Sequence, residues 1–133
     1  MTPAQEPRAA SQGELEGRWA KARQFADVCD LIEHDASVDG DLVDAYVTLA
    51  VHSGIASADV ICISALGAYW ANGNHDQAVT LLARADAKAA NHLRRLLALK
   101  TKAGYSHRPA SAADVKTAAA AHQTLLEIAR AQR

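Results

Sequence analysis

The most continuous apolar pattern in the chain lies in residues 41–70. Apolar or small residues recur there in alternating steps of four and three, at Leu42, Tyr46, Leu49, Ser53, Ala56, Val60, Ile63, Gly67 and Trp70. This spacing places them along one face of a helix. The positions beside that face are also largely apolar, so we expect a central helix that other helices cover on several sides.

Three further segments show a narrower apolar stripe, which is typical of helices that cover a core with one face. They are residues 14–36, residues 74–103 and a last segment that begins at Ser111. Short loops between them favour antiparallel neighbours, so the pattern predicts an all-α, up-and-down bundle of four helices, with five as an open alternative. We expect residues 1–13 to form a flexible lead-in and residues 14–133 to form one helical domain.

The helix boundaries are predicted from capping residues. Asp39 or Asp41 is expected to cap the central helix, which should end at residues 71–73. Asn74 is followed three residues later by Gln77, and Ser111 is followed three residues later by Asp114. Both pairs are typical of a helix start.

Composition narrows the function classes. The formal charge of the 133 residues is −1, so any attraction to nucleic acid must come from a local basic patch. Cys29 and Cys62 fall on predicted buried faces, which fits a reduced cytoplasm and argues against a disulfide framework. We interpret the chain as having neither a signal peptide nor a membrane span, and we expect no membrane partner.

Three polar residues interrupt the predicted core. His52 and Asp59 are seven residues apart on the central helix, hence on one face and separated by roughly 10 Å. Lys100 occupies the position where the apolar stripe of residues 74–103 would continue with a leucine. A buried carboxylate or ammonium is costly without a partner, so we expect Asp59 to pair with Lys100.

The order of these segments resembles the HEPN superfamily (higher eukaryotes and prokaryotes nucleotide-binding domain). The resemblance covers about residues 40–130 and rests on the helix AVHSGIASADVICISALG, the helix end LLALKTKAGYSH and the helix start SAADV. It implies a bundle of four or five helices that forms a homodimer in prokaryotic conflict systems. Many members of this family are metal-independent endoribonucleases, and others are inactive partners of nucleotidyltransferases or nucleotide-binding modules.

The family's catalytic motif is an arginine, a polar residue and a histidine at the end of the third helix. Carried over, Lys100 matches the arginine, Thr101 the polar residue and His107 the histidine. Lysine replaces arginine here, and an ammonium lacks the planar fork with which a guanidinium holds a phosphate. The substitution weighs against catalysis more than against the fold.

The residues of this segment suit the chemistry independently of the family. Metal-free RNA cleavage needs an acid and a base, a role for which histidine is suited and His107 is the candidate. It also needs a cation for the phosphate, for which Lys100 or Lys102 is available. Tyr105 can stack on a base, and Arg108 extends the positive patch. We expect no metal and no cofactor.

Simpler interpretations exist for each residue. Cations at the end of a helix suit its dipole, and His107 on a loop can be merely solvated. We interpret His52 and His122 as satisfied core histidines and His75 as a local feature of a helix start. Four further cations are predicted to form a solvated face: Arg84, Lys88, Arg94 and Arg95.

Three functional hypotheses follow. The first is a HEPN-like protein that binds RNA or a nucleotide and cleaves RNA without metal as part of a toxin or defence system, with a nucleotidyltransferase or antitoxin as a candidate partner. The second is a catalytically inactive, dimeric module of the same fold that docks a partner protein. The third is a small bundle that binds a ligand between its helices.

Overall fold

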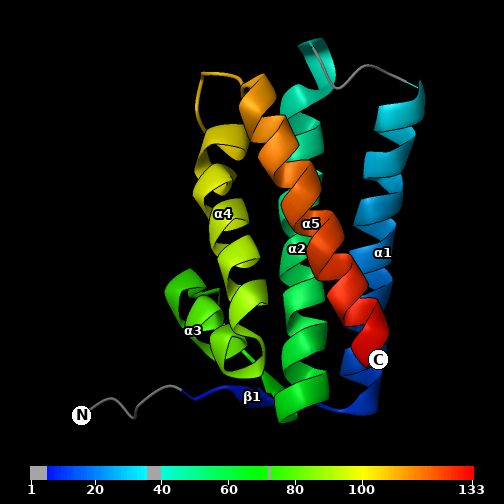
Figure 1. The fold of residues 1–133 in the computed structure, drawn as a ribbon, viewed down its shortest axis with the longest axis vertical. Coiled ribbons are helices and arrows are strands. Elements are labelled where there is room, and N and C mark those ends of the chain that lie inside the picture. Colours follow the sequence, from blue (N-terminus) through cyan, green and yellow to red (C-terminus); the bar gives the residue numbers. More distant parts are fainter. Residues whose placement is uncertain (1–5, 36–39, 72) are drawn as a thin grey trace.

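The computed structural model describes residues 6–35, 40–71 and 73–133, and it confirms an all-α bundle (Figure 1). Its helices in the described part are α1 (Gln12–Asp35), α2 (Val43–Leu66), α3 (His75–Ala85), α4 (Ala87–Gly104) and α5 (Ala112–Gln132). A 3₁₀ turn, Gly40–Leu42, precedes α2. Two short strands, β1 (Arg8–Ala9) and β2 (Ala68–Tyr69), pair antiparallel.

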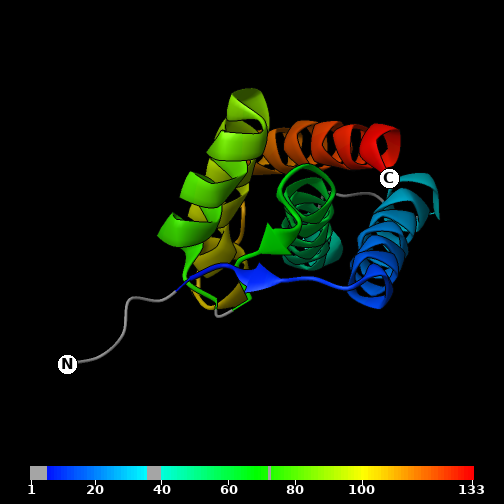
Figure 2. The ribbon, with the colours of Figure 1, turned by 90° about the horizontal axis from the view of Figure 1, so that it is seen from below.

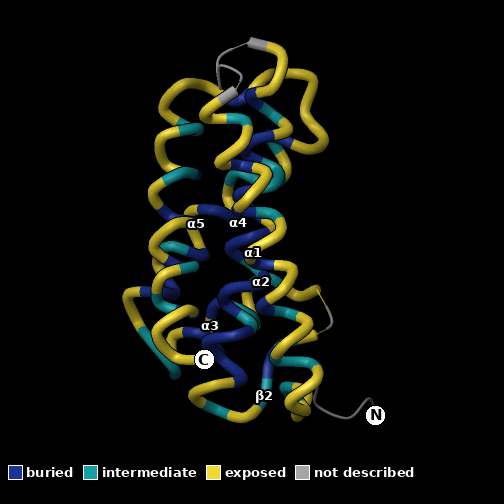
Figure 3. The backbone as a smooth tube through the Cα atoms, turned by 90° about the vertical axis from the view of Figure 1, so that its right-hand side faces the viewer, coloured by how far each residue is buried: buried dark blue, intermediate teal, exposed yellow. Residues whose placement is uncertain are grey.

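The predicted central helix is α2. Seen from below, α2 lies between α1, α5 and the α3–α4 pair, and of the described elements the β1–β2 ribbon lies on its remaining side (Figure 2). Buried residues line the interior that these helices share (Figure 3). The largest fully buried side chains in this core include Tyr46, Ile61, Leu82, Leu93, Leu96 and Leu125.

By length and composition alone, α2 could cross a membrane, since it has 24 residues and its most apolar 18-residue segment has a mean hydropathy of 1.6. In the bundle, however, 61% of its most apolar segment is buried against the other helices. Such burial is typical of the central helix of a soluble protein.

The segment predicted as one helix over residues 74–103 is two helices. The break is at Asp86, whose backbone is extended (φ −160°, ψ 107°) and whose side chain accepts a hydrogen bond from the N–H of Ala89 at 2.9 Å. An aspartate that caps a new helix competes with continuation of the old one. The apolar stripe runs on through both helices and therefore concealed the break.

The end predicted for α2 at residues 71–73 is wrong, because α2 ends at Leu66. Gly67 adopts the left-handed conformation (φ 72°), and its N–H bonds the carbonyl of Ile63 at 2.9 Å. This is a standard helix stop. The chain then turns into β2, which fastens Arg8 and Ala9 alongside Tyr69 and Ala68.

The two predicted caps of later helices are confirmed. Ser111 and Asp114 form a reciprocal capping box, and the side chain of Asn74 accepts from the N–H of Gln77 at 3.0 Å. The prediction that Asp41 caps α2 is wrong, because Asp41 lies inside the 3₁₀ turn. The N-cap residue is Leu42, which makes no side-chain hydrogen bond to the helix. The alternative, Asp39, lies outside the described residues.

A close contact sets the distance between α2 and α4. A Cβ atom added to Gly54 would overlap Cδ1 of Leu96 on α4 and would lie 3.3 Å from Cδ1 of Leu125 on α5. Glycine at this position therefore lets three helices approach one another at the centre of the bundle.

The two cysteines are buried and free. Burial raises the pKa of Cys29 and of Cys62 to about 12. Both thiols are therefore protonated at neutral pH, as expected of cysteines that serve as core residues.

Candidate functional site

One face of α2 is less covered than the rest of the helix. Its members are Thr48, His52, Ile55 and Asp59, which follow one another in steps of four, three and four and are all partly or fully exposed. We call these residues the open face of α2. Because α1 and α4 lie on either side of α2, polar side chains of those helices can meet on this face (Figure 2).

Lys100 lies at one edge of the open face and contacts a histidine. Its Nζ atom is 3.0 Å from Nε2 of His75, the first residue of α3. An ammonium only donates, so His75 accepts through an unprotonated Nε2. The break at Asp86 makes this contact possible, because α3 folds back beside α4.

A second histidine shares the field of Lys100. Burial lowers the pKa of His52, and the positive charges of Lys100 and Arg18 lower it further. Burial and Lys100 likewise lower the pKa of His75, with Asp76 opposing the shift. Both imidazoles are therefore mostly neutral at pH 7 and can accept a proton beside a fixed positive charge.

His52 is exposed on α2, so its predicted role as a core histidine is wrong. Its ring packs against Phe25 of α1 with centroids 5.7 Å apart. His122 is buried as predicted, at 1% exposure, but it is not satisfied. Neither of its ring nitrogens has a hydrogen-bond partner among the described residues.

Asp59 pairs with Arg18 of α1, and the predicted pairing with Lys100 is wrong. The Nε atom of Arg18 donates to Oδ2 of Asp59 at 2.8 Å. Burial raises the pKa of Asp59 to about 6, although Arg18 pulls it downward. The prediction failed because α1 reaches this level of α2 and supplies a cation from 41 residues away.

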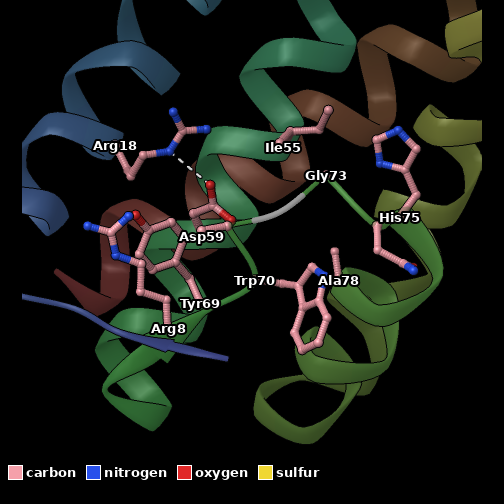
Figure 4. Close-up of a pocket in the computed structure, with 11 residues that line it drawn as sticks. Arg8, Arg18, Ile55, Asp59, Tyr69, Trp70, Gly73, His75 and Ala78 are labelled. Carbon is pink, nitrogen blue, oxygen red and sulfur yellow. Dashed lines mark hydrogen bonds and ion pairs between the residues drawn. The ribbon is translucent and has the colours of Figure 1, made fainter. Parts of the chain in front are cut away.

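A cavity of about 310 Å³ opens beside this ion pair (Figure 4). Its walls come from β1, α1, α2, β2, the following turn and α3, through Arg8, Arg18, Ile55, Asp59, Tyr69, Trp70, Ala71, Gly73, Asn74, His75 and Ala78. We call it the arginine pocket. His75 belongs both to this pocket and to the contact with Lys100, so the two features form one continuous site.

Two aromatic residues, Tyr69 and Trp70, line the arginine pocket. The hydroxyl of Tyr69 donates to Glu14 at 2.7 Å, and Glu14 also lies 3.6 Å from Arg8. The ring of Trp70 points toward Ala78, and its indole N–H is buried without a hydrogen-bond partner in the part of the chain described (Figure 4). The pocket thus combines guanidinium groups, aromatic rings and an unused donor.

The remaining predicted site residues follow Lys100 in the last turn of α4 and in the loop after it. Lys102 forms an ion pair with Asp114 at 2.6 Å, which ties α4 to the start of α5. Tyr105 is 80% exposed, and the other predicted members, Thr101, His107 and Arg108, are exposed as well. No contact joins His107 to Lys100 or Asp59 among residues 6–35, 40–71 and 73–133.

The structure therefore gathers Lys100 with residues that the sequence interpretation set aside. The contact of His75 with Lys100 depends on the turn between α3 and α4, whereas His52 lies on α2 and shares the electrostatic field of Lys100. The only sequence signal for Arg18 was its place outside the apolar stripe of residues 14–36. That it lies beside Asp59 is seen only in the structure. Within the described residues, no group of three or more histidine, cysteine, aspartate or glutamate side chains is placed to hold a metal ion.

Comparisons of the chain with protein-family models, with curated proteins and with solved structures found no match. The site is therefore interpreted from its own geometry.

Proposed function

We propose that this protein binds RNA along the open face of α2 and cleaves it without a metal ion at a lysine–histidine cluster formed by His52, His75 and Lys100. The contact between Lys100 and the imidazole of His75 carries the proposal. It places a phosphate-binding cation directly beside a proton acceptor, with a second imidazole in the same field. Metal-free cleavage of RNA requires these groups.

The chemistry assigns a role to each member. One neutral imidazole takes the proton of the ribose 2′-hydroxyl, and the 2′-oxygen attacks phosphorus. The bond from phosphorus to the 5′-oxygen breaks, and the second histidine, in its protonated form, donates a proton to that oxygen. Lys100 stabilises the negative charge that develops on the phosphorane. The products are a 2′,3′-cyclic phosphate and a 5′-hydroxyl.

The arginine pocket supports the same ligand class. Single-stranded RNA is recognised by cations that follow its backbone and by aromatic rings on which bases stack. Arg8, Arg18, Tyr69 and Trp70 provide both kinds of group next to His75. A strand that places one phosphate at Lys100 can place a neighbouring nucleotide in this pocket.

The resemblance to the HEPN superfamily agrees with the proposal at Lys100, the position of the motif arginine. Here His75 and His52, rather than His107, supply the imidazoles. In line with that resemblance, we propose a cytoplasmic homodimer that acts in a toxin or defence system.

The test is cleavage of a 5′-labelled, 20-nucleotide RNA by the pure protein in EDTA. We expect products that end in a 2′,3′-cyclic phosphate, and we expect Lys100→Ala, His75→Ala and His52→Ala each to reduce the rate at least a hundredfold. The rate should be highest below pH 6.5, because both histidines have lowered pKa values and one must be protonated.

Lys102→Ala is the matched control, since Lys102 belongs to the same helix but already pairs with Asp114. Binding is measured separately with 2′-O-methyl RNA, which cannot be cleaved by this route. An unmutated protein that leaves RNA intact contradicts the enzymatic part of the proposal. Loss of cleavage in His107→Ala with full activity in His75→Ala would instead locate the centre on the loop.

A further inference from the structure

A second groove lies between α4 and α5, and none of its lining residues belongs to the open face of α2. The end of α4 and the start of α5 lie side by side at the loop that joins them, and the helices diverge from there as α5 crosses toward α1 (Figure 1). The space between them is about 400 Å³ and is lined by His92 and Arg95 from α4 and by Ala113, Lys116, Thr117, Ala120 and Ala121 from α5. We call it the α4–α5 groove.

The walls of the groove are positively charged. Arg95 on one side and Lys116 on the other have neither an ion-pair nor a hydrogen-bond partner among the described residues. No aspartate or glutamate is among the residues that line the groove. On α4, Lys88 and His92 precede Arg95 by seven and three residues and so continue the same stripe. A chain with a net charge of −1 thus carries a local cationic strip here.

The floor of the groove differs in character from its walls. Three alanines of α5 and the aliphatic stems of Arg95 and Lys116 leave it mainly apolar and shallow. Small side chains at such positions allow another helix to approach closely. The Lys102–Asp114 ion pair fixes the start of α5 against α4 and so helps to hold the groove in shape.

This combination discriminates between two kinds of anionic partner. A nucleic-acid backbone gains from the cations but nothing from an alanine floor, and the residues that line the groove include no tyrosine, tryptophan or phenylalanine on which a base could stack. An amphipathic helix uses both features, because its apolar ridge packs on the floor while acidic residues beside the ridge meet the cations.

We propose that the α4–α5 groove is a docking site for an acidic, amphipathic α-helix of a partner protein. The helix lies along the groove, its apolar ridge contacts Ala113, Ala120 and Ala121, and its carboxylates pair with Arg95 and Lys116. The inference stands independently of the RNA chemistry at Lys100, since the two sites share no residue.

The test uses an 18-residue fluorescein-labelled peptide with capped ends. Its leucines follow one another in alternating steps of three and four residues, and a glutamate stands beside each leucine. A twin peptide with lysine for each glutamate is the matched control. Fluorescence anisotropy should show binding of the acidic peptide to the 133-residue protein and no binding of its twin. Arg95→Glu with Lys116→Glu should weaken acidic-peptide binding at least tenfold.

The floor is tested by Ala120→Trp, which fills the groove and keeps both wall charges; we expect at least a tenfold loss. Lys21→Glu with Arg23→Glu makes the same change in charge on exposed positions of α1 and should alter affinity less than twofold. Circular dichroism confirms that each variant is folded.

Absence of acidic-peptide binding overturns the proposal, as does binding that is equal in the groove variants and the α1 control. A labelled 2′-O-methyl RNA that loses affinity in the wall variant, but keeps it in Lys100→Ala, would assign the groove to nucleic acid and would also overturn it. Peptide binding that survives Lys100→Ala, in a protein without RNA cleavage, would support this inference while the proposed function fails.

Discussion

Lys100 is a half-buried cation that bonds an imidazole and has no carboxylate partner among the described residues. Taking an ammonium partly out of water costs free energy that a neutral histidine offsets only in part. A bound phosphate would supply the missing negative charge. The neighbouring cation, Arg18, is in the opposite situation, because Asp59 already neutralises it at 2.8 Å.

The Arg18–Asp59 pair predicts a pH dependence of RNA binding. The pKa of Asp59 is about 6 in the folded protein, above the ordinary 3.8, so the carboxylate becomes protonated as the pH falls from 7.5 to 5. Arg18 is then no longer neutralised, and His52 and His75 also gain charge at the acidic end of this range. Affinity for 2′-O-methyl RNA, measured by fluorescence anisotropy, should therefore rise as the pH falls.

Asp59→Asn should raise this affinity roughly fivefold at pH 7.5, equivalent to about 1 kcal/mol for one removed charge, and should reduce the further gain at pH 5. Asp27→Asn, an exposed position on α1, is the matched control and should leave the pH profile unchanged. Equal profiles for the parent and Asp59→Asn would contradict this role for Asp59.

At the scale of elements, α2 and α4 position the site by packing closely. Gly54 faces Leu96, four residues before Lys100 on the same helix. A larger side chain at residue 54 must displace Leu96 or separate the helices, because protein cores are close-packed. The depth of Lys100 between α2 and α3 therefore depends on a residue that takes no part in the chemistry.

Gly54→Val should lower the free energy of unfolding by about 1–3 kcal/mol through overpacking, measured by urea denaturation. Gly17→Val is the control, since a Cβ at Gly17 on α1 meets nothing within 4 Å. We expect its effect to stay within about 0.5 kcal/mol. A similar loss in both variants would contradict the role of the α2–α4 contact, because valine has a higher helix propensity than glycine and Gly17 has no neighbour to displace.

The helices themselves were predictable, because a stripe of buried residues leaves a direct record in the spacing of apolar positions. The break at Asp86 was not, since Ala85 and Ala89 keep the stripe continuous across it. That break turns α3 back beside α4 and brings His75 to Lys100. The partner of Asp59 was equally hidden, because an ion pair across 41 residues depends on how deeply α1 overlaps α2. The spacing of apolar residues thus showed which polar residues interrupt the core, but it could not show which of them contact one another.

At the scale of the whole molecule, one buried group links stability to pH. His122 lies in the core between α1, α2 and α5, where its ring meets Tyr46 edge-on at 6.4 Å. Burial lowers the pKa of His122, although Glu33 and Asp30 of α1 act in the opposite direction. In the unfolded chain, the pKa of His122 returns to its ordinary value of about 6.5. Below this pH the unfolded chain therefore binds a proton at His122 that the folded protein does not bind.

The free energy of unfolding should therefore be flat above pH 6.5 on account of His122 and should fall below it, by up to about 1.4 kcal/mol per pH unit while the folded ring stays neutral. His122→Leu should remove the part of this loss that His122 causes, as measured by urea denaturation at pH 7.5 and 5.5. His52 and His75, whose pKa values are also lowered, contribute equally in both proteins. Asp59 has a raised folded pKa and contributes the opposite slope between about pH 4 and 6, but both proteins share it. If the free energy of unfolding fell as much between pH 7.5 and 5.5 in His122→Leu as in the parent protein, this account would be contradicted.

The arginine pocket draws its walls from segments that are distant in sequence, from Arg8 on β1 to Ala78 on α3. It exists only while the ribbon and the bundle are assembled, so a compound that occupies it must raise the melting temperature. At a hundred times its dissociation constant, such a compound adds about 2.7 kcal/mol to the free energy of unfolding. A thermal-shift screen of mononucleotides and short oligonucleotides is therefore a direct route to the natural occupant.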